Sequence, residues 1–138
     1  MRMVPMKFWL PPVIYTGLII FASSLPGGVV SEYSLNVSDK LLHTLHFLFY
    51  GLTLMWAFTN TQPIHSVFRN AYLKTILVGI SVGCLDEFYQ SFMPTRTSSG
   101  WDILADSTGI ILAGVTFYLA TKLSVVERVR SDVKTDQN

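Results

Sequence analysis

The sequence is short of charge and nearly without cysteine. Only 14% of its 138 residues are charged, whereas a soluble domain carries about 25%. Ten Lys and Arg face nine Asp and Glu, so no basic excess points to a nucleic-acid partner, and we expect none. A single cysteine, Cys84, excludes a disulfide framework within the chain and a metal site built from cysteines. What is present instead is apolar. Half of the residues are hydrophobic and the mean hydropathy is +0.42, a composition typical of a membrane protein.

Four apolar segments lie along the chain, at 8–25, 41–58, 75–85 and 103–121. A helix needs roughly 20 residues to cross the hydrocarbon of a bilayer. The third segment reaches that length only if its helix continues through the polar residues Asp86, Glu87 and Gln90. We therefore predict an all-α fold, a polytopic membrane bundle of four transmembrane helices with a polar pocket in the outer half.

Lys and Arg are unevenly distributed between these segments. The N-terminus, the segment 59–74 and the C-terminal tail hold most of them, whereas the loops 26–40 and 93–101 carry one each. Because cytoplasmic loops are enriched in Lys and Arg, we expect both termini to be cytoplasmic. The domain then covers 1–124, and 125–138 forms a polar cytoplasmic tail that ends the last helix in solvent. The alternative for the first segment is a secretory signal peptide.

Polar and small residues recur at helical spacing in the last three segments. Positions i, i+4, i+7 and i+11 are occupied by Asp39, His43, His46 and Tyr50, by Gly79, Gly83, Asp86 and Gln90, and by Asp102, Asp106, Gly109 and Ala113. This spacing places each set on one face of its helix. A charge in contact with lipid costs about 2.5–3.5 kcal/mol near the bilayer centre. We therefore expect the three faces to turn inward and meet.

The residues expected in this pocket carry an excess of negative charge. Two cations, Lys40 and Arg96, face five acids, which are Asp39, Asp86, Glu87, Asp102 and Asp106. An apolar site does not hold such an excess. Protonated carboxyl groups, charged histidines or a bound cation must therefore reduce it. The first two outcomes provide groups for acid–base chemistry.

The candidate catalytic residues are His43, Asp86 and Asp102. The expected ligand-binding residues are Asp39, Lys40, Tyr50, Glu87, Gln90, Arg96 and Asp106. Arg96 is the expected anion clamp because its guanidinium offers a rigid donor fork to phosphate or carboxylate. Two structural alternatives stay open. Tyr50 could be an ordinary interior aromatic, and Glu87, about 100° from the stripe of its helix, could meet only lipid headgroups.

A metal site is the weaker interpretation. His43 and His46, three residues apart, could both ligate a metal with Asp or Glu completing the shell. The pattern H-x-x-H is short, however, and paired histidines also serve helix packing. We therefore assign no metal ligand, and the sequence does not identify a cofactor.

Three stretches of the chain resemble the VanZ-like membrane proteins. They are SSLP (23–26), DKLLHTLHFLFYG (39–51) and DEFYQSFMPTRTSSGWDILADSTGIILAG (86–114). The family pattern runs D-K-x-x-H-x(6)-Y, then D-E-x-x-Q-x-F-x-P-x-R, then D-x-x-x-N/D-x-x-G. The matching positions are Asp39, Lys40, His43, Tyr50, Asp86, Glu87, Gln90, Phe92, Pro94, Arg96, Asp102, Asp106 and Gly109. Asp106 stands where the family often has asparagine.

The resemblance implies a multi-pass protein of the bacterial cytoplasmic (inner) membrane with a role in the cell envelope, since the family's namesake is linked to resistance to the antibiotic teicoplanin. Together with the residues, it favours a pocket that binds or processes an anionic envelope precursor, either a lipid-linked phosphate or a peptidoglycan carboxylate. Membrane lipids are the other expected partners, and the oligomeric state is not predicted. Two alternatives remain: a non-catalytic scaffold or assembly partner whose polar network fixes helix packing, and a metal-dependent membrane hydrolase or transferase.

Overall fold

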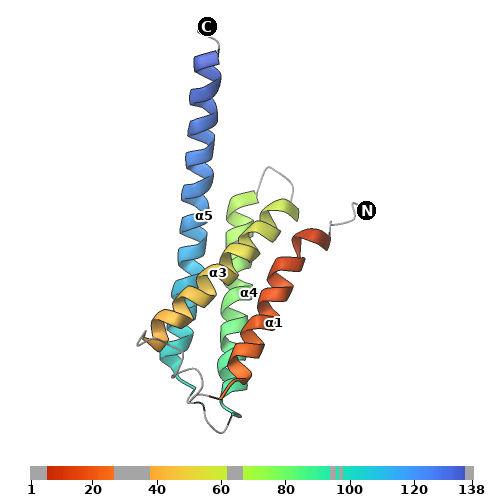
Figure 1. Cartoon of the computed structure of the whole chain (residues 1–138), viewed down its shortest axis with the longest axis vertical. Coiled ribbons are helices and arrows are strands. Elements are labelled where there is room, and N and C mark those ends of the chain that lie inside the picture. The colour runs from red at the N-terminus through yellow and green to blue at the C-terminus, as the bar shows by residue number, and fades with distance from the viewer. Residues whose placement is uncertain (1–5, 27–37, 62–66, 94–95, 97, 136–138) are drawn as a thin grey trace.

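A computed structural model of the chain describes residues 6–26, 38–61, 67–93, 96 and 98–135 (Figure 1). These residues are helical apart from short connections, which confirms the all-α prediction. The elements are the 3-10 turn η1 (Met6–Phe8), α1 (Leu10–Ser24), α3 (Asp39–Thr61), α4 (Val67–Gln90) and α5 (Gly100–Thr135). Pro94, which belongs to the predicted motif, lies outside the described residues.

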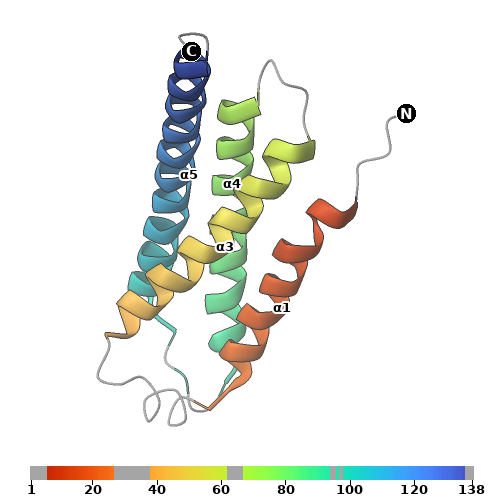
Figure 2. The same cartoon turned by 45° about the horizontal axis from the view of Figure 1, so that its top comes forward.

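The four helices alternate in direction, so each end of the bundle brings together the starts of two helices and the ends of the other two (Figures 1 and 2). The end of α1, the start of α3, the end of α4 and the start of α5 meet at one end, called the polar end below. The N-terminal end of α1 and the C-terminal end of α5 lie at the opposite end of the bundle. Helix α3 packs against each of the other three, and in the described helices α1 and α5 do not contact each other.

Among the described residues, three helical stretches are long and apolar enough to cross a membrane, namely Met6–Ser24, Asp39–Thr61 and Gly100–Ser124. Helix α4 is about 36 Å long, enough to span, but it is not among them. Lys74, Asp86 and Glu87 all fall within it and lower its hydropathy. Large apolar side chains face outward from the bundle, such as Phe21 on α1 and Leu77 on α4. Such a surface is expected where lipid replaces water.

Close packing of α3 against α5 fixes the relative positions of the polar residues at the polar end. Gly109 lies against the backbone of α3, where an added Cβ would sit 2.7 Å from the nitrogen of Leu48. The hydroxyl of Thr44 donates to the carbonyl of Ala105 at 3.2 Å, which also requires a short interhelical distance. The apolar core lies deeper, around Phe47 and Ile110. The first turns of α3 and α5 are thereby held side by side.

Helix α5 is the longest element. It continues without a break from Gly100 to Thr135 and so includes most of the predicted tail 125–138. Its last turns project beyond the other helices (Figure 1). The boundary at residue 124 therefore does not coincide with a break in secondary structure, and the cytoplasmic placement of the tail stays a prediction.

Candidate functional site

A histidine and a buried aspartate are joined across the seam between α3 and α5. Oδ1 of Asp106 lies 2.9 Å from Nδ1 of His43. The side chain of Asp106 is 1% exposed and that of His43 is 13% exposed. The sequence predicts Asp86 and Asp102 as the catalytic candidates beside His43, but the carboxylate hydrogen-bonded to the His43 ring is that of Asp106. The close approach of the helices at Gly109 places Asp106 beside His43.

A lysine pairs with the next carboxylate toward the polar end. The Nζ of Lys40 contacts Oδ1 of Asp102, and it lies 3.6 Å from Oδ2 of Asp39. Asp102 is buried, whereas more than half of the Asp39 side chain is exposed. Lys40 is therefore the counter-ion of Asp102. Its contact with Asp39 is at the surface, where an ion pair contributes little.

The third buried aspartate, Asp86 on α4, is satisfied by two neutral side chains. The hydroxyl of Ser23 donates to its Oδ1 at 2.5 Å, and Nε2 of Gln90 donates to its Oδ2 at 2.8 Å. The same Gln90 nitrogen also donates to the Ser23 hydroxyl at 3.3 Å. All three side chains are buried. Ser23 was absent from the predicted site because α1 carries no polar stripe. Only its place in SSLP, within the family resemblance, marked it.

Glu87 is buried as well, at 4% exposure, so the alternative that it meets only lipid headgroups is wrong. Its Oε2 accepts a hydrogen bond from the backbone nitrogen of Ser99 at 2.8 Å. This contact ties the end of α4 to the residue that precedes α5. Its other oxygen, Oε1, and Oδ2 of Asp106 are buried without a hydrogen-bond partner among the described residues.

Arg96, on the connection between α4 and α5, binds the C-terminal end of α1. Its Nε donates to the carbonyl of Leu25 at 3.1 Å, and Nη2 donates to the carbonyl of Ala22 at 2.8 Å. A cation is favourable here because the last carbonyls of a helix are unsatisfied and carry partial negative charge. Within the described part of the chain, Arg96 forms no ion pair with a carboxylate. It is not the counter-ion of the buried acids.

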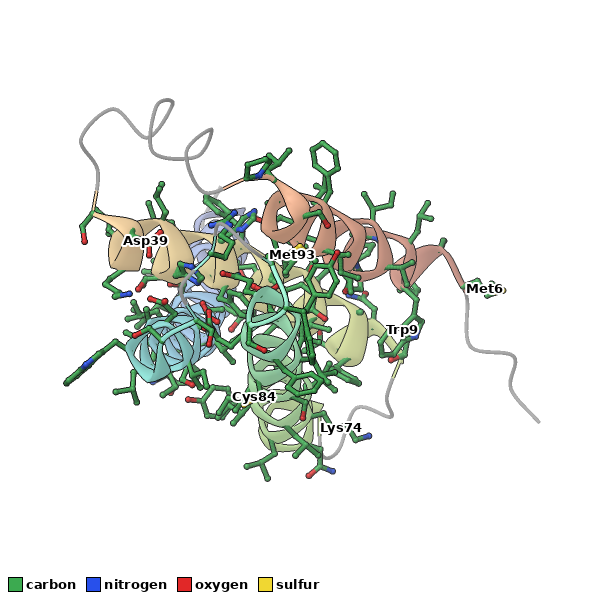
Figure 3. The ribbon with its side chains drawn as sticks, turned by 90° about the horizontal axis from the view of Figure 1, so that it is seen from below. Met6, Trp9, Asp39, Lys74, Cys84 and Met93 are labelled. Carbon is green, nitrogen blue, oxygen red and sulfur yellow. The ribbon has the colours of Figure 1, made fainter. Side chains whose placement is uncertain are left out.

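A cavity of about 360 Å³ opens among α1, α3 and α4 at the polar end. Its polar lining residues are Ser23, Asp39, His43, His46, Asp86, Gln90 and Arg96. Figure 3 looks toward this end and shows Asp39, the first residue of α3, and Met93, just beyond the end of α4. Tyr50 does not line the cavity. It is buried in the core and its hydroxyl accepts a hydrogen bond from Thr16 at 3.1 Å, as the interior-aromatic alternative predicts.

One group of side chains has the composition of a cation site. Ligand atoms of Asp39, His43 and Asp102 lie within 4.8 Å of one another. This group differs from the predicted pairing of two histidines, because His46 is not part of it and instead makes an edge-type ring contact with Tyr15. The ammonium group of Lys40 already contacts both of these aspartates. A divalent cation would therefore compete with Lys40.

These features define a class, an integral membrane protein whose buried polar side chains gather at one end of its helices. The chain belongs to the VanZ/LLP1 family, whose sequence model matches residues 4–121. It is 33% identical over 101 residues to the uncharacterized protein C11E3.10 of Schizosaccharomyces pombe. That match covers 72% of this chain and 57% of the yeast protein, so the chain spans little more than half the length of this relative. No solved structure matches the chain significantly.

Proposed function

We propose that this protein binds the anionic headgroup of a lipid-linked phosphate in the cavity at the polar end. The proposal rests on the position and the contacts of Arg96. Its guanidinium lines the cavity and has no carboxylate partner among the described residues. The buried acids nearby are engaged elsewhere: Asp86 with Ser23 and Gln90, and Asp102 with Lys40. An anionic ligand would supply the missing counter-charge.

The geometry of Arg96 suits this role. Two carbonyls of α1 accept from Nε and Nη2, and a guanidinium has five N–H donors in a fixed plane. The carbonyls hold the plane in place and leave the remaining donors for a ligand. A phosphate or carboxylate accepts two parallel hydrogen bonds from such a fork.

Of the two predicted anions, the lipid-linked phosphate is favoured over the peptidoglycan carboxylate. Peptidoglycan is a bacterial wall polymer, whereas a relative of this chain occurs in a fission yeast. A lipid-linked phosphate is a class of molecule that both kinds of organism can present at a membrane. In a bacterium such a lipid would be an envelope precursor, which would account for the family's link to teicoplanin.

The proposal includes a placement in the membrane. Helix α4 crosses the bilayer together with the three more apolar helices, because Asp86, Glu87 and Gln90 are all turned into the bundle. The distribution of Lys and Arg puts both termini in the cytoplasm. The polar end then lies in the outer half of a bacterial cytoplasmic membrane, with the cavity at headgroup depth.

Chemistry on the bound molecule would involve His43. Asp106 holds Nδ1 of its ring, and His43 lines the cavity. A carboxylate on one ring nitrogen fixes the tautomer and leaves the other nitrogen for proton transfer. Asp106 is therefore the partner that this proposal assigns to His43, in place of Asp86 or Asp102.

Binding is tested with purified protein in lipid nanodiscs, using hexadecyl phosphate as the probe and hexadecanol as the uncharged comparison. We expect saturable binding of the phosphate alone, weakened by Arg96→Ala. Lys74→Ala, which removes a cation from the other end of α4, is the matched control and should bind normally. Equal binding of the phosphate by both variants would refute the role of Arg96.

A metal-dependent hydrolase or transferase is the second candidate, favoured by the grouping of Asp39, His43 and Asp102. Metal analysis of the purified protein tests it, followed by Mn²⁺ binding to Asp102→Asn. Stoichiometric metal that is lost in this variant would establish the site. Binding of hexadecyl phosphate that persists in a chelator would exclude a metal-bridged ligand.

The scaffold alternative predicts a closed and fully paired polar network. The cavity argues against it, and so do two carboxylate oxygens of this end, Oε1 of Glu87 and Oδ2 of Asp106, which are buried without a hydrogen-bond partner among the described residues. Such atoms weaken a network whose only role is to fix packing, because an unsatisfied buried polar group costs about 1–3 kcal/mol.

A further inference from the structure

A second hollow, an apolar crevice between α1 and α4, adjoins the cavity. It has a volume of about 220 Å³ and is lined by Thr16, Ile19 and Ile20 from α1 and by Val82, Leu85, Asp86 and Tyr89 from α4. Asp86 lines the cavity as well, so the two spaces share this side chain as a common wall. We infer that the crevice holds the hydrocarbon chain of the ligand whose headgroup binds at Arg96. This inference rests on the proposed function and adds a ligand class, an amphiphile bound by both of its parts.

The position of the crevice supports a chain from the same molecule. Ile20 and Leu85 are 52% and 65% exposed, so the crevice opens on the outer, apolar surface of the bundle. The hydrogen bond between Ser23 and Asp86 joins α1 to α4. Both of these residues line the cavity, and Asp86 lines the crevice as well, so the two spaces adjoin at Asp86. A molecule with its phosphate in the cavity would thus have its chain emerge between α1 and α4.

The contents of the two spaces also divide as the two parts of an amphiphile would require. Seven of the twelve residues that line the cavity are polar, among them Arg96, His43 and Gln90, whereas five of the seven residues of the crevice are hydrophobic. A water molecule occupies about 30 Å³ of liquid, so the crevice has room for a run of several methylene groups. The rest of a long chain would lie in the bilayer. Between membrane segments, shape rather than hydrophobicity selects the partner, and filling the crevice is therefore the appropriate perturbation.

The test uses the full chain in nanodiscs with a hexadecyl phosphate that carries a diazirine in the middle of its chain. After irradiation, peptide mass spectrometry locates the labelled residues. We expect the label on the crevice residues of α1 and α4, removed by an excess of plain hexadecyl phosphate and lost in Arg96→Ala. Leu85→Trp should reduce the labelling roughly 5- to 100-fold, the range expected when extra atoms enter an occupied space.

Two matched controls carry the same new side chain on the same helices. Leu77, which is 70% exposed, lies two turns from Leu85 on α4, and Leu77→Trp is the control there. On α1, Ile20→Trp is a second variant that fills the crevice, and Leu18→Trp is its control. Neither control residue lines the crevice. We expect the crevice residues of both control variants to be labelled to the same extent as in the unmodified protein. Butyl phosphate, which has the headgroup without a long chain, should compete equally well in Leu85→Trp and in Leu77→Trp.

The outcomes separate this inference from the function on which it rests. Label that depends on Arg96 but spreads over all helices, or that falls equally in Leu85→Trp and Leu77→Trp, overturns the crevice and leaves headgroup binding intact. Crevice label that survives Arg96→Ala shows a chain bound without its headgroup and overturns the link between the two spaces. Absence of saturable phosphate binding overturns the proposed function and the inference together.

Discussion

Asp106 and His43 form a contact of 2.9 Å between Oδ1 and Nδ1, with the aspartate almost wholly buried. If Nδ1 carries the proton, this contact requires only a hydrogen-bond acceptor at position 106. The side-chain oxygen of asparagine is also an acceptor. This explains how a family with asparagine at this position, as the resemblance implies, keeps the same histidine.

Asp106→Asn should therefore keep ligand binding within about 1 kcal/mol of the original, because the hydrogen bond to His43 survives. Asp106→Leu should be destabilised by about 1–3 kcal/mol, because it leaves Nδ1 buried without a partner. Thr108→Leu, on the exposed side of α5, is the control. Hexadecyl phosphate binding and thermal denaturation measure both effects. Equal damage by Asn and Leu would show that the charge of Asp106 matters more than its acceptor.

Arg96→Lys should weaken ligand binding about tenfold or more, since a charge-assisted hydrogen bond contributes roughly 1.5–3 kcal/mol. Lysine keeps the charge but loses the planar fork, and it cannot reproduce the two hydrogen bonds to Leu25 and Ala22 together. The measurement is binding for Arg96→Lys and Arg96→Ala at equal amounts of folded protein. Full binding by the lysine variant would mean that charge alone suffices.

Gly109→Ala should lower the stability of the bundle by about 1–3 kcal/mol. Its new methyl group would meet the backbone of α3 at Leu48, which cannot rotate away. Gly17→Ala is the matched control, because nothing lies within 4 Å of a Cβ at that position. A helix interior favours alanine over glycine by about 1 kcal/mol, so the control should be neutral or stabilised. Thermal denaturation in detergent compares the two, and equal midpoints would contradict the close packing of α3 and α5.

Ser23→Ala should reduce stability by about 1–3 kcal/mol, because it removes the donor to Oδ1 of the buried Asp86. The neighbouring change Ser24→Ala should have less effect. Ser24 is exposed, and its contact with the hydroxyl of Tyr89 is open to solvent. The same denaturation assay applies. If the two alanine variants unfold alike, the link between α1 and α4 does not depend on Asp86.

Topology is tested by cysteine labelling after the exposed native thiol is removed with Cys84→Ala. Ser98→Cys, next to the polar end, should react with an impermeant maleimide added outside intact cells. Ser66→Cys, between the second and third apolar segments and outside the described residues, should react only after permeabilisation. External labelling of position 66 would reverse the proposed orientation.

Sequence periodicity predicted which helix faces meet, but it could not assign the pairs. Asp102 and Asp106 are one turn apart on the same face, so either could reach His43. The choice depends on how far α5 slides along α3, and the backbone contact at Gly109 sets this. Ser23 was missed for a related reason. Its helix has no polar stripe, and only the neighbouring Asp86 gives its hydroxyl a role.

The sequence predicts a pool of excess negative charge in which Lys40 and Arg96 are the two cations that face five acids. In the structure Arg96 donates to backbone carbonyls at the C-terminal end of α1, and Lys40 forms an ion pair with Asp102. The position of Arg96 is thus set by hydrogen bonds to backbone carbonyls. Backbone carbonyls occur at every position, so a pattern of side chains does not reveal which of them will be left unsatisfied.

The unbroken course of α5 makes it a lever. Asp102 and Asp106 lie in its first two turns, and the helix continues to Thr135, about 54 Å from its start. A rigid rod of that length moves its far end by about 5 Å when it tilts by 5° at its base. A small change in how α5 sits against His43 and Lys40 is thereby magnified at the opposite end of the molecule.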